Sequence, residues 1–154
     1  MLPKYHFFIG VIFAVVLYFL FPHIGIINIL IIFISNIFID ADHGLYYVLK
    51  EKNLNPFKCY NWYKFNRKKT LSLPINERKK IYSGFYLFHG IEWIIILFLL
   101  GKYFNAFYFV SLGFFLHWIV DFYDEYVQKG TVDKISLIYN VYRWRKLENK
   151  KERI

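Results

Sequence analysis

Four apolar runs alternate with short polar segments along this chain. The runs cover residues 7–21, 24–39, 91–100 and 103–120. Within them only Glu92 carries a formal charge. A helix that spans a bilayer needs about 20 mainly apolar residues, and each run reaches that length only when its polar ends are included. The pattern therefore predicts membrane helices whose polar residues lie about one turn inside the helix ends.

Turn signals mark the ends of the predicted helices. We expect helices over residues 5–21, 24–43, 82–101 and 103–127. Pro22 ends the first helix, Gly44 supplies a glycine cap for the second, and Gly101 ends the third. The predicted fold is all-α, an integral membrane four-helix bundle over residues 1–127 with a basic tail over residues 128–154. A soluble helical bundle is the alternative, but four such runs would require a very large core.

Composition favours a membrane protein. The chain has 154 residues, of which 57% are hydrophobic and 23% aromatic, and a soluble domain of this length is less apolar. Residues 7–21 lack a cleavage site of small residues and run directly into the next apolar segment, so we interpret them as a retained helix. Cys59 is the single cysteine, which excludes an intramolecular disulfide and a cysteine-based zinc finger.

The basic side chains gather in a loop over residues 45–80 and in the tail, which includes Lys129, Lys134 and Arg153. Lysine and arginine are retained on the cytoplasmic side, so both termini are predicted to be cytoplasmic in a multi-pass protein of the inner (plasma) membrane. Aromatic residues interleave with the lysines of the loop, which suits anionic lipid headgroups or nucleic acid. Alternatively, these charges only fix the topology. The candidate headgroup contacts are Lys64, Arg67, Lys68 and Lys69.

Each predicted helix carries metal-type ligands at its cytoplasmic end. The groups are His6, then Asp40, Asp42 and His43, then His89 and Glu92, then His117, Asp121 and Asp124. An up-and-down bundle brings these four ends together. Asn36, Asp40 and His43 have the spacing of one helix face, and the last group has it too. Imidazole and carboxylate groups on facing helices are typical of Zn, Mn or Fe sites.

The spacing suggests a role for each group. The expected ligands of one to three divalent ions, with zinc preferred, are His6, Asp40, His43, His89, Glu92, His117 and Asp121. Asp42 would bridge two ions or act as a base on water, and Glu92 would share the catalytic work. Asn36 and Asp124 would hold ligands in place. A charge at the bilayer centre costs about 2.5–3.5 kcal/mol, and a bound dication would offset such a cost.

The order of the motifs resembles a known family. After an early histidine, "DADH" closes one apolar helix, "FHGIEW" opens the next, and "HWIVD" closes the last. This order is similar to that of the LexA-binding, inner membrane-associated hydrolases, which are distantly like zinc-dependent phospholipase C and P1-type nucleases. The resemblance covers residues 1–125 and implies metal-dependent hydrolysis. Many members have a second histidine in the third motif, where this chain has Glu92.

The main hypothesis is a membrane-embedded metal-dependent hydrolase that acts on a phosphoester or lipid-like substrate at the cytoplasmic interface. One alternative is a non-catalytic metal-binding or transport protein. The ligands lie at one end, and the helix interiors 11–20 and 94–100 are apolar, which argues against transport. The other alternative is a membrane anchor that binds nucleic acid or a protein through the basic loop.

Overall fold

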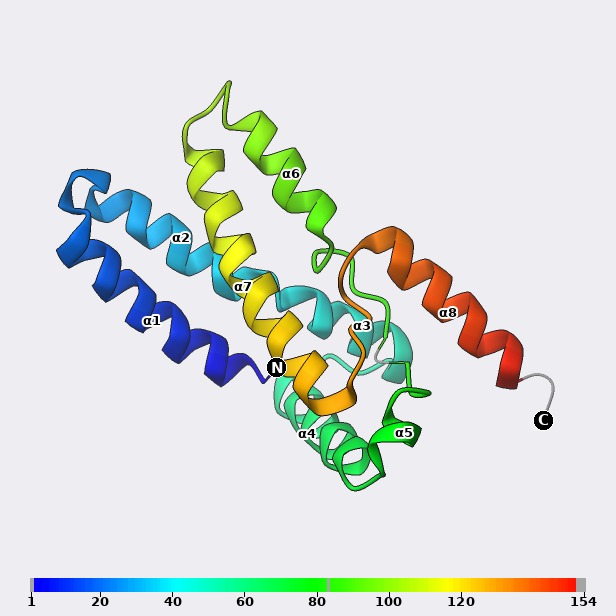
Figure 1. The fold of residues 1–154 in the computed structure, drawn as a ribbon. Coiled ribbons are helices and arrows are strands. Elements are labelled where there is room, and N and C mark those ends of the chain that lie inside the picture. The colour runs from blue at the N-terminus through cyan, green and yellow to red at the C-terminus, as the bar shows by residue number, and fades with distance from the viewer. Residues whose placement is uncertain (1, 83, 152–154) are drawn as a thin grey trace.

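Helices account for all the regular structure that the described residues contain. The computed structural model describes residues 2–82 and 84–151, with side chains as far as residue 147. Over these residues it contains helices and connecting segments but no strand (Figure 1). The all-α prediction is therefore confirmed. Arg153, which we assigned to the basic tail, lies outside the described residues.

The apolar runs form the long helices of the fold. In chain order the elements are α1 (Pro3–Leu20), the 3-10 helix η1 (Pro22–Ile24), α2 (Ile26–Phe38), α3 (Ala41–Glu51), α4 (Pro56–Leu71), α5 (Ile75–Arg78), α6 (Ile91–Leu100), α7 (Ala106–Lys129) and α8 (Leu137–Lys151). Three segments are long and apolar enough to cross a membrane, namely α1, α2 with α3, and α7. The ten residues of α6 extend only about 15 Å, half the thickness of a bilayer core.

The long helices pack through small residues and leave their large apolar side chains outside. α2 packs against both α1 and α7, and α6 packs against α7 (Figure 1). A Cβ atom added to Gly113 would lie 2.5 Å from the carbonyl oxygen of Ile32 and would also clash with Ser35, so this glycine allows α7 to approach α2 closely. By contrast, Phe8 and Ile27 are more than half exposed. This inside-out distribution suits a lipid environment.

The helix predicted over residues 24–43 is interrupted at its polar end. The N–H of Asp40 bonds to the carbonyl of Ile37, and the N–H of Asp42 bonds to that of Ile39. These tight turns end α2 and redirect the chain into α3. Gly44 therefore lies inside a helix, and the prediction that it caps one is wrong. α3 ends instead at Lys52, whose φ of 50° is left-handed.

The helix predicted over residues 82–101 begins later than expected. Residues 84–90 are not helical, and Gly84 has a φ of 127°. Groups outside the segment take up its backbone hydrogen bonds: the N–H of Phe88 donates to Asp42, and the indole of Trp93 donates to the carbonyl of Leu87. His89 consequently lies in a turn before α6, so the prediction that it begins a helix is wrong.

The segments predicted as a basic loop and a tail contain helices too. Residues 45–80 include most of α3 together with α4 and α5, and α8 follows α7 after Gly130. Asn55 caps α4, since its side chain accepts from the N–H groups of Phe57 and Lys58. These helices gather at the end of the long helices where the predicted ligands lie (Figure 1).

Candidate metal centre

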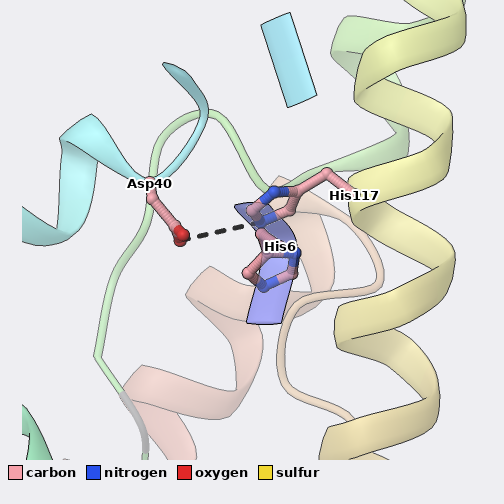
Figure 2. Close-up of side chains that lie close together, drawn as sticks. All are labelled: His6, Asp40 and His117. Atoms are coloured by element: carbon pink, nitrogen blue, oxygen red, sulfur yellow. Dashed lines mark ion pairs between the residues drawn. The ribbon is translucent and has the colours of Figure 1, made fainter. Parts of the chain in front are cut away.

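Side chains from four parts of the chain meet where the long helices end. His6 comes from α1, Asp40 from the break between α2 and α3, and His117 from α7; Figure 2 shows these three directed toward one another. His43 of α3, His89 of the turn before α6, and Asp121 of α7 complete the cluster. Three overlapping groups share these residues, with ligand atoms within 4.8 Å of one another: His6, Asp40 and His117; Asp40, His43 and His89; His89, His117 and Asp121.

Five separations among four candidate ligand atoms are close to those of a tetrahedral metal site. The Nε2 atoms of His89 and His117 lie 3.2 Å apart. Oδ2 of Asp121 lies 3.4 and 3.7 Å from these two nitrogens, and Oδ1 of Asp40 lies 3.8 and 3.7 Å from them. Ligand atoms around a tetrahedral zinc ion are about 3.3–3.5 Å apart at ordinary bond lengths. The observed separations fit such an ion within a few tenths of an ångström.

Hydrogen bonds on the far side of each ring direct lone pairs into the cluster. Nδ1 of His117 lies 2.7 Å from the carbonyl oxygen of Asn36, and Nδ1 of His89 lies 3.1 Å from the carboxylate of Asp42. Both partners accept, so Nδ1 is the donor in each neutral ring and Nε2 carries the lone pair. Two such lone pairs 3.2 Å apart repel unless a cation lies between them. The cluster therefore fits a metal ion.

Unpaired polar atoms support the same interpretation. Both carboxylate oxygens of Asp40 and Nδ1 of His6 are buried with no hydrogen-bond partner among the described residues. Oδ1 of Asn36 shares this property. Buried polar atoms are almost always hydrogen-bonded, because their loss of water otherwise costs on the order of 1–3 kcal/mol. A cation bound beside Asp40 would remove that cost for its carboxylate.

Asp42 and Asn36 hold other residues in place. The Asp42 carboxylate accepts from the backbone N–H of Phe88 at 2.9 Å and lies 3.1 Å from Nδ1 of both His43 and His89. These contacts place it behind the two imidazoles, and the bridging or base role expected of it stays a prediction. The side-chain amide of Asn36 donates to the carbonyl of His6.

His6 and Asp121 form a second contact at the centre. The His6 ring stacks on His117, with centroids 3.9 Å apart and planes inclined by 10°. Nε2 of His6 lies 3.1 Å from Oδ1 of Asp121. The exposed fraction is 1% for His6, 0% for His117 and 3% for Asp121. These three residues are therefore held rigidly and away from bulk water.

Glu92 and Asp124 do not join the cluster. Glu92 accepts from the N–H groups of Leu137 and Ile138 at 2.9 and 3.5 Å, where its charge stabilises the start of α8. Glu92 thus lies against the start of α8, and its expected metal-binding and catalytic roles stay a prediction. Asp124 forms a two-pronged ion pair with Arg67 at 2.9 and 3.0 Å, and its expected role of holding a ligand stays a prediction too.

Lys134 lies in the centre, although we assigned it to the basic tail. Its Nζ lies 2.7 Å from Oδ2 of Asp121 and 3.2 Å from Nε2 of His43. It also lies 4.6 Å from the ring centroid of Tyr86. Burial disfavours the ammonium, but Asp121 and Glu125 raise the pKa of Lys134 above its ordinary value. Nothing in the sequence separates this lysine from its basic neighbours, since only the loop after α7 brings it back to the cluster.

The carboxylates of the centre would attract a dication. Asp40, Asp42 and Asp121 lie between 3.1 and 3.8 Å from the ring nitrogens of His89, and Nζ of Lys134 lies 2.7 Å from Oδ2 of Asp121. The imidazoles must be neutral for metal ligation, so a cation would offset the repulsion among these carboxylates. Without a metal, a proton takes part of this role. Burial and Lys134 oppose protonation of His89, but the nearby carboxylates of Asp121, Asp40 and Asp42 raise its pKa to about 9.

A cavity of about 890 Å³ opens beside the centre. Asp40, His43, Asp121 and Lys134 line one part of it, and aromatic and basic side chains of α3 and α4 line another. Tyr63 fixes α4 against α3, because its hydroxyl donates to the carbonyl of His43 at 2.9 Å. Among the four predicted headgroup contacts, Arg67 and Lys69 line the cavity, whereas Lys64 and Lys68 do not.

A second set of buried charges attaches α8 to α7. Lys129 contacts Glu125 at 3.2 Å and Asp133 at 3.3 Å, and Arg143 contacts Asp133 at 2.9 Å. Asn140 hydrogen-bonds with Tyr82 and with the carbonyl of Asp133. This network keeps the segment that carries Lys134 in place.

Comparison with known proteins finds no match for this chain. No protein-family model matches the chain, and neither a curated protein nor a solved structure matches it. The resemblance to the LexA-binding membrane hydrolases therefore stays a prediction that depends on motif order. The functional argument depends on the geometry of the centre alone.

Proposed function

We propose that this protein is a membrane-embedded, metal-dependent hydrolase of phosphoester or lipid-like substrates. The observation that carries the proposal is a buried cluster in which the Nε2 atoms of His89 and His117 lie 3.2 Å apart and carboxylate oxygens of Asp40 and Asp121 lie 3.4–3.8 Å from them. Its position beside a cavity of about 890 Å³ gives a substrate access to it. A buried metal centre with no opening would favour a purely structural role instead.

The membrane setting is the second part of the proposal. Three segments have spanning length, and α6, with its flanking residues, forms a shorter fourth element of a membrane bundle. The basic segments then lie on the cytoplasmic side of the inner membrane, together with both termini. The centre would lie on that same side, because His6 is in the first turn of α1 and Asp40 follows the end of α2. An amphiphile would therefore enter the cavity sideways from the inner leaflet.

Zinc is the metal that the ligands suit best. Two imidazole nitrogens and two carboxylate oxygens form a common zinc set, with Mn or Fe as alternatives. Beside these four groups the ion would take a water molecule as a further ligand, as catalytic zinc sites can, and it would polarise a phosphoryl oxygen and lower the pKa of that water. His89 and His117 would hold it with rings oriented by Asp42 and the carbonyl of Asn36.

The residues that line the cavity perform the remaining steps. Oδ2 of Asp40 has no hydrogen-bond donor among the described residues, so it is placed to accept the proton of the attacking water. Lys134 presents an ammonium to an anionic group of the substrate. Arg67 and Lys69 on α4 attract that group toward the centre. Together they favour a phosphoryl group over a neutral ester.

The test combines metal content with turnover. We expect detergent-purified wild type to retain metal by mass spectrometry and to hydrolyse phosphodiester or phospholipid probes. His117→Ala with Asp121→Ala should lose both properties, while Glu77→Gln, an exposed carboxylate on α5, should keep both. A folded double variant that turns over these probes as fast as wild type would refute the proposal. Wild type that retains metal without turning over any probe would favour the non-catalytic alternative.

A further inference from the structure

Lys134 occupies a place that a second metal ion would otherwise take. Its ammonium contacts Asp121 and His43, and these are two of the residues that the sequence predicts as ligands. His43 has its other ring nitrogen, Nδ1, against Asp42 at 3.1 Å. Since the carboxylate accepts at Nδ1 and the ammonium donates to Nε2, His43 has no lone pair left for a metal.

We propose that the ammonium of Lys134 replaces a second metal ion, so that the centre binds a single ion, held by His89, His117, Asp40 and Asp121. This inference rests on the proposed function, whose metal site it specifies. Sites with two metals hold the ions about 3.5–4 Å apart and use both to stabilise the attacking and leaving oxygens. Here the ammonium of Lys134 would supply one of those two positive charges.

Charge and packing both support this assignment. The ammonium lies 2.7 Å from Asp121, and Tyr86 covers it with its ring at 4.6 Å, so the side chain is packed into position. A second dication in the same place would face that ammonium at contact distance, and the two positive charges would repel strongly in a buried site. A second ion therefore requires the removal of Lys134.

Removal of the Lys134 ammonium would create a second metal site from the residues around it. Without the ammonium, Nε2 of His43 becomes available, and Oδ2 of Asp121 loses its contact at 2.7 Å with Nζ. Asp40 already belongs to a ligand group with His43, and its Oδ2 has no hydrogen-bond partner among the described residues. These three residues are enough to bind a second ion, with both carboxylates bridging to the first.

The experiment measures bound zinc per chain. Wild type, Lys134→Met and Lys134→Arg are loaded with excess zinc, passed through a desalting column, and analysed by mass spectrometry. We expect bound zinc to double in Lys134→Met relative to wild type and to stay unchanged in Lys134→Arg, which keeps the charge. Lys102→Met is the control, because Lys102 is exposed and follows the end of α6 that is opposite to His89, and it should leave the zinc content unchanged.

A measurement on wild type covers the case in which Lys134→Met does not fold. Manganese-loaded wild type should give the electron paramagnetic resonance spectrum of isolated ions, without the exchange interaction of two neighbouring ions. An exchange-coupled spectrum, or two zinc ions per wild-type chain, would overturn the assignment of Lys134 and leave the proposed hydrolase intact. Folded Lys134→Met with the same zinc content as wild type would overturn it as well. Wild type without any bound metal would overturn the proposed function and this inference together.

Discussion

Replacing Asp42 by asparagine tests whether the cluster is a metal centre without removing any ligand that we assign. The substitution preserves shape but replaces a carboxylate that contacts Nδ1 of His43, Nδ1 of His89 and the N–H of Phe88. An asparagine amide has one oxygen that accepts and one nitrogen that only donates. At least one imidazole then faces an N–H group and must take the other tautomer, with its proton on Nε2.

The expected size of the effect follows from this change of tautomer. If His89 holds its proton on Nε2, the nitrogen directed at His117 from 3.2 Å can no longer bind a metal until the tautomer reverts. Loss of such a supporting carboxylate typically reduces metal affinity 10–100-fold. That factor corresponds to about 1.4–2.7 kcal/mol of binding free energy.

The assay is a competition between the protein and a chromophoric chelator for zinc, in detergent at constant pH. Asp124→Asn is the control, because Asp124 is also partly buried and ion-paired, in this case with Arg67, but lies outside the cluster. We expect weaker zinc binding in Asp42→Asn and wild-type binding in Asp124→Asn. Equal affinity of wild type and folded Asp42→Asn would refute the role of Asp42 and the tautomers that we assign.

Three further predictions concern pH, metal removal and helix packing. Zinc must displace the proton of His89, whose pKa is raised to about 9. The apparent zinc affinity should therefore rise between pH 6 and pH 9. An affinity that does not change with pH in the chelator competition would contradict this. Metal removal should lower the thermal midpoint, because a metal held at 100 times its Kd stabilises the fold by about 2.7 kcal/mol; identical melting curves with and without chelator would count against the centre. Gly113→Ala should destabilise the protein by about 1–3 kcal/mol, because the new methyl group clashes with Ile32. Gly44→Ala has open space around the new methyl group and should stabilise helix α3 by about 0.5–1 kcal/mol. Thermal melts in detergent that rank the two variants the other way would contradict the packing of α2 on α7.

Two segments differ from the helices that the sequence predicts. Asn36 and His43 were assigned to one helix face by their spacing, but the turn at Asp40 separates them into two helices. His89 was assigned to the same helix as Glu92, yet the contacts of Asp42 and Trp93 hold residues 84–90 out of a helix. At Asp40, tight turns to Ile37 and Ile39 replace the helical hydrogen bonds. At Phe88, a hydrogen bond to the distant Asp42 replaces a helical one, and no local pattern indicates it.

Patterns of neighbouring residues were enough to predict the long helices and most residues of the cluster. Each apolar run consists of consecutive residues and can be recognised without knowledge of the fold, so the sequence by itself determined an all-α chain with long apolar helices. It also singled out histidines and aspartates that the structure brings together. Only the tertiary structure decided that Glu92 and Asp124 turn away, that Asp42 supports two imidazoles, and that Lys134 enters the centre. The physical reason is that these contacts join residues from different elements, whose separation in space depends on the packing of the whole chain.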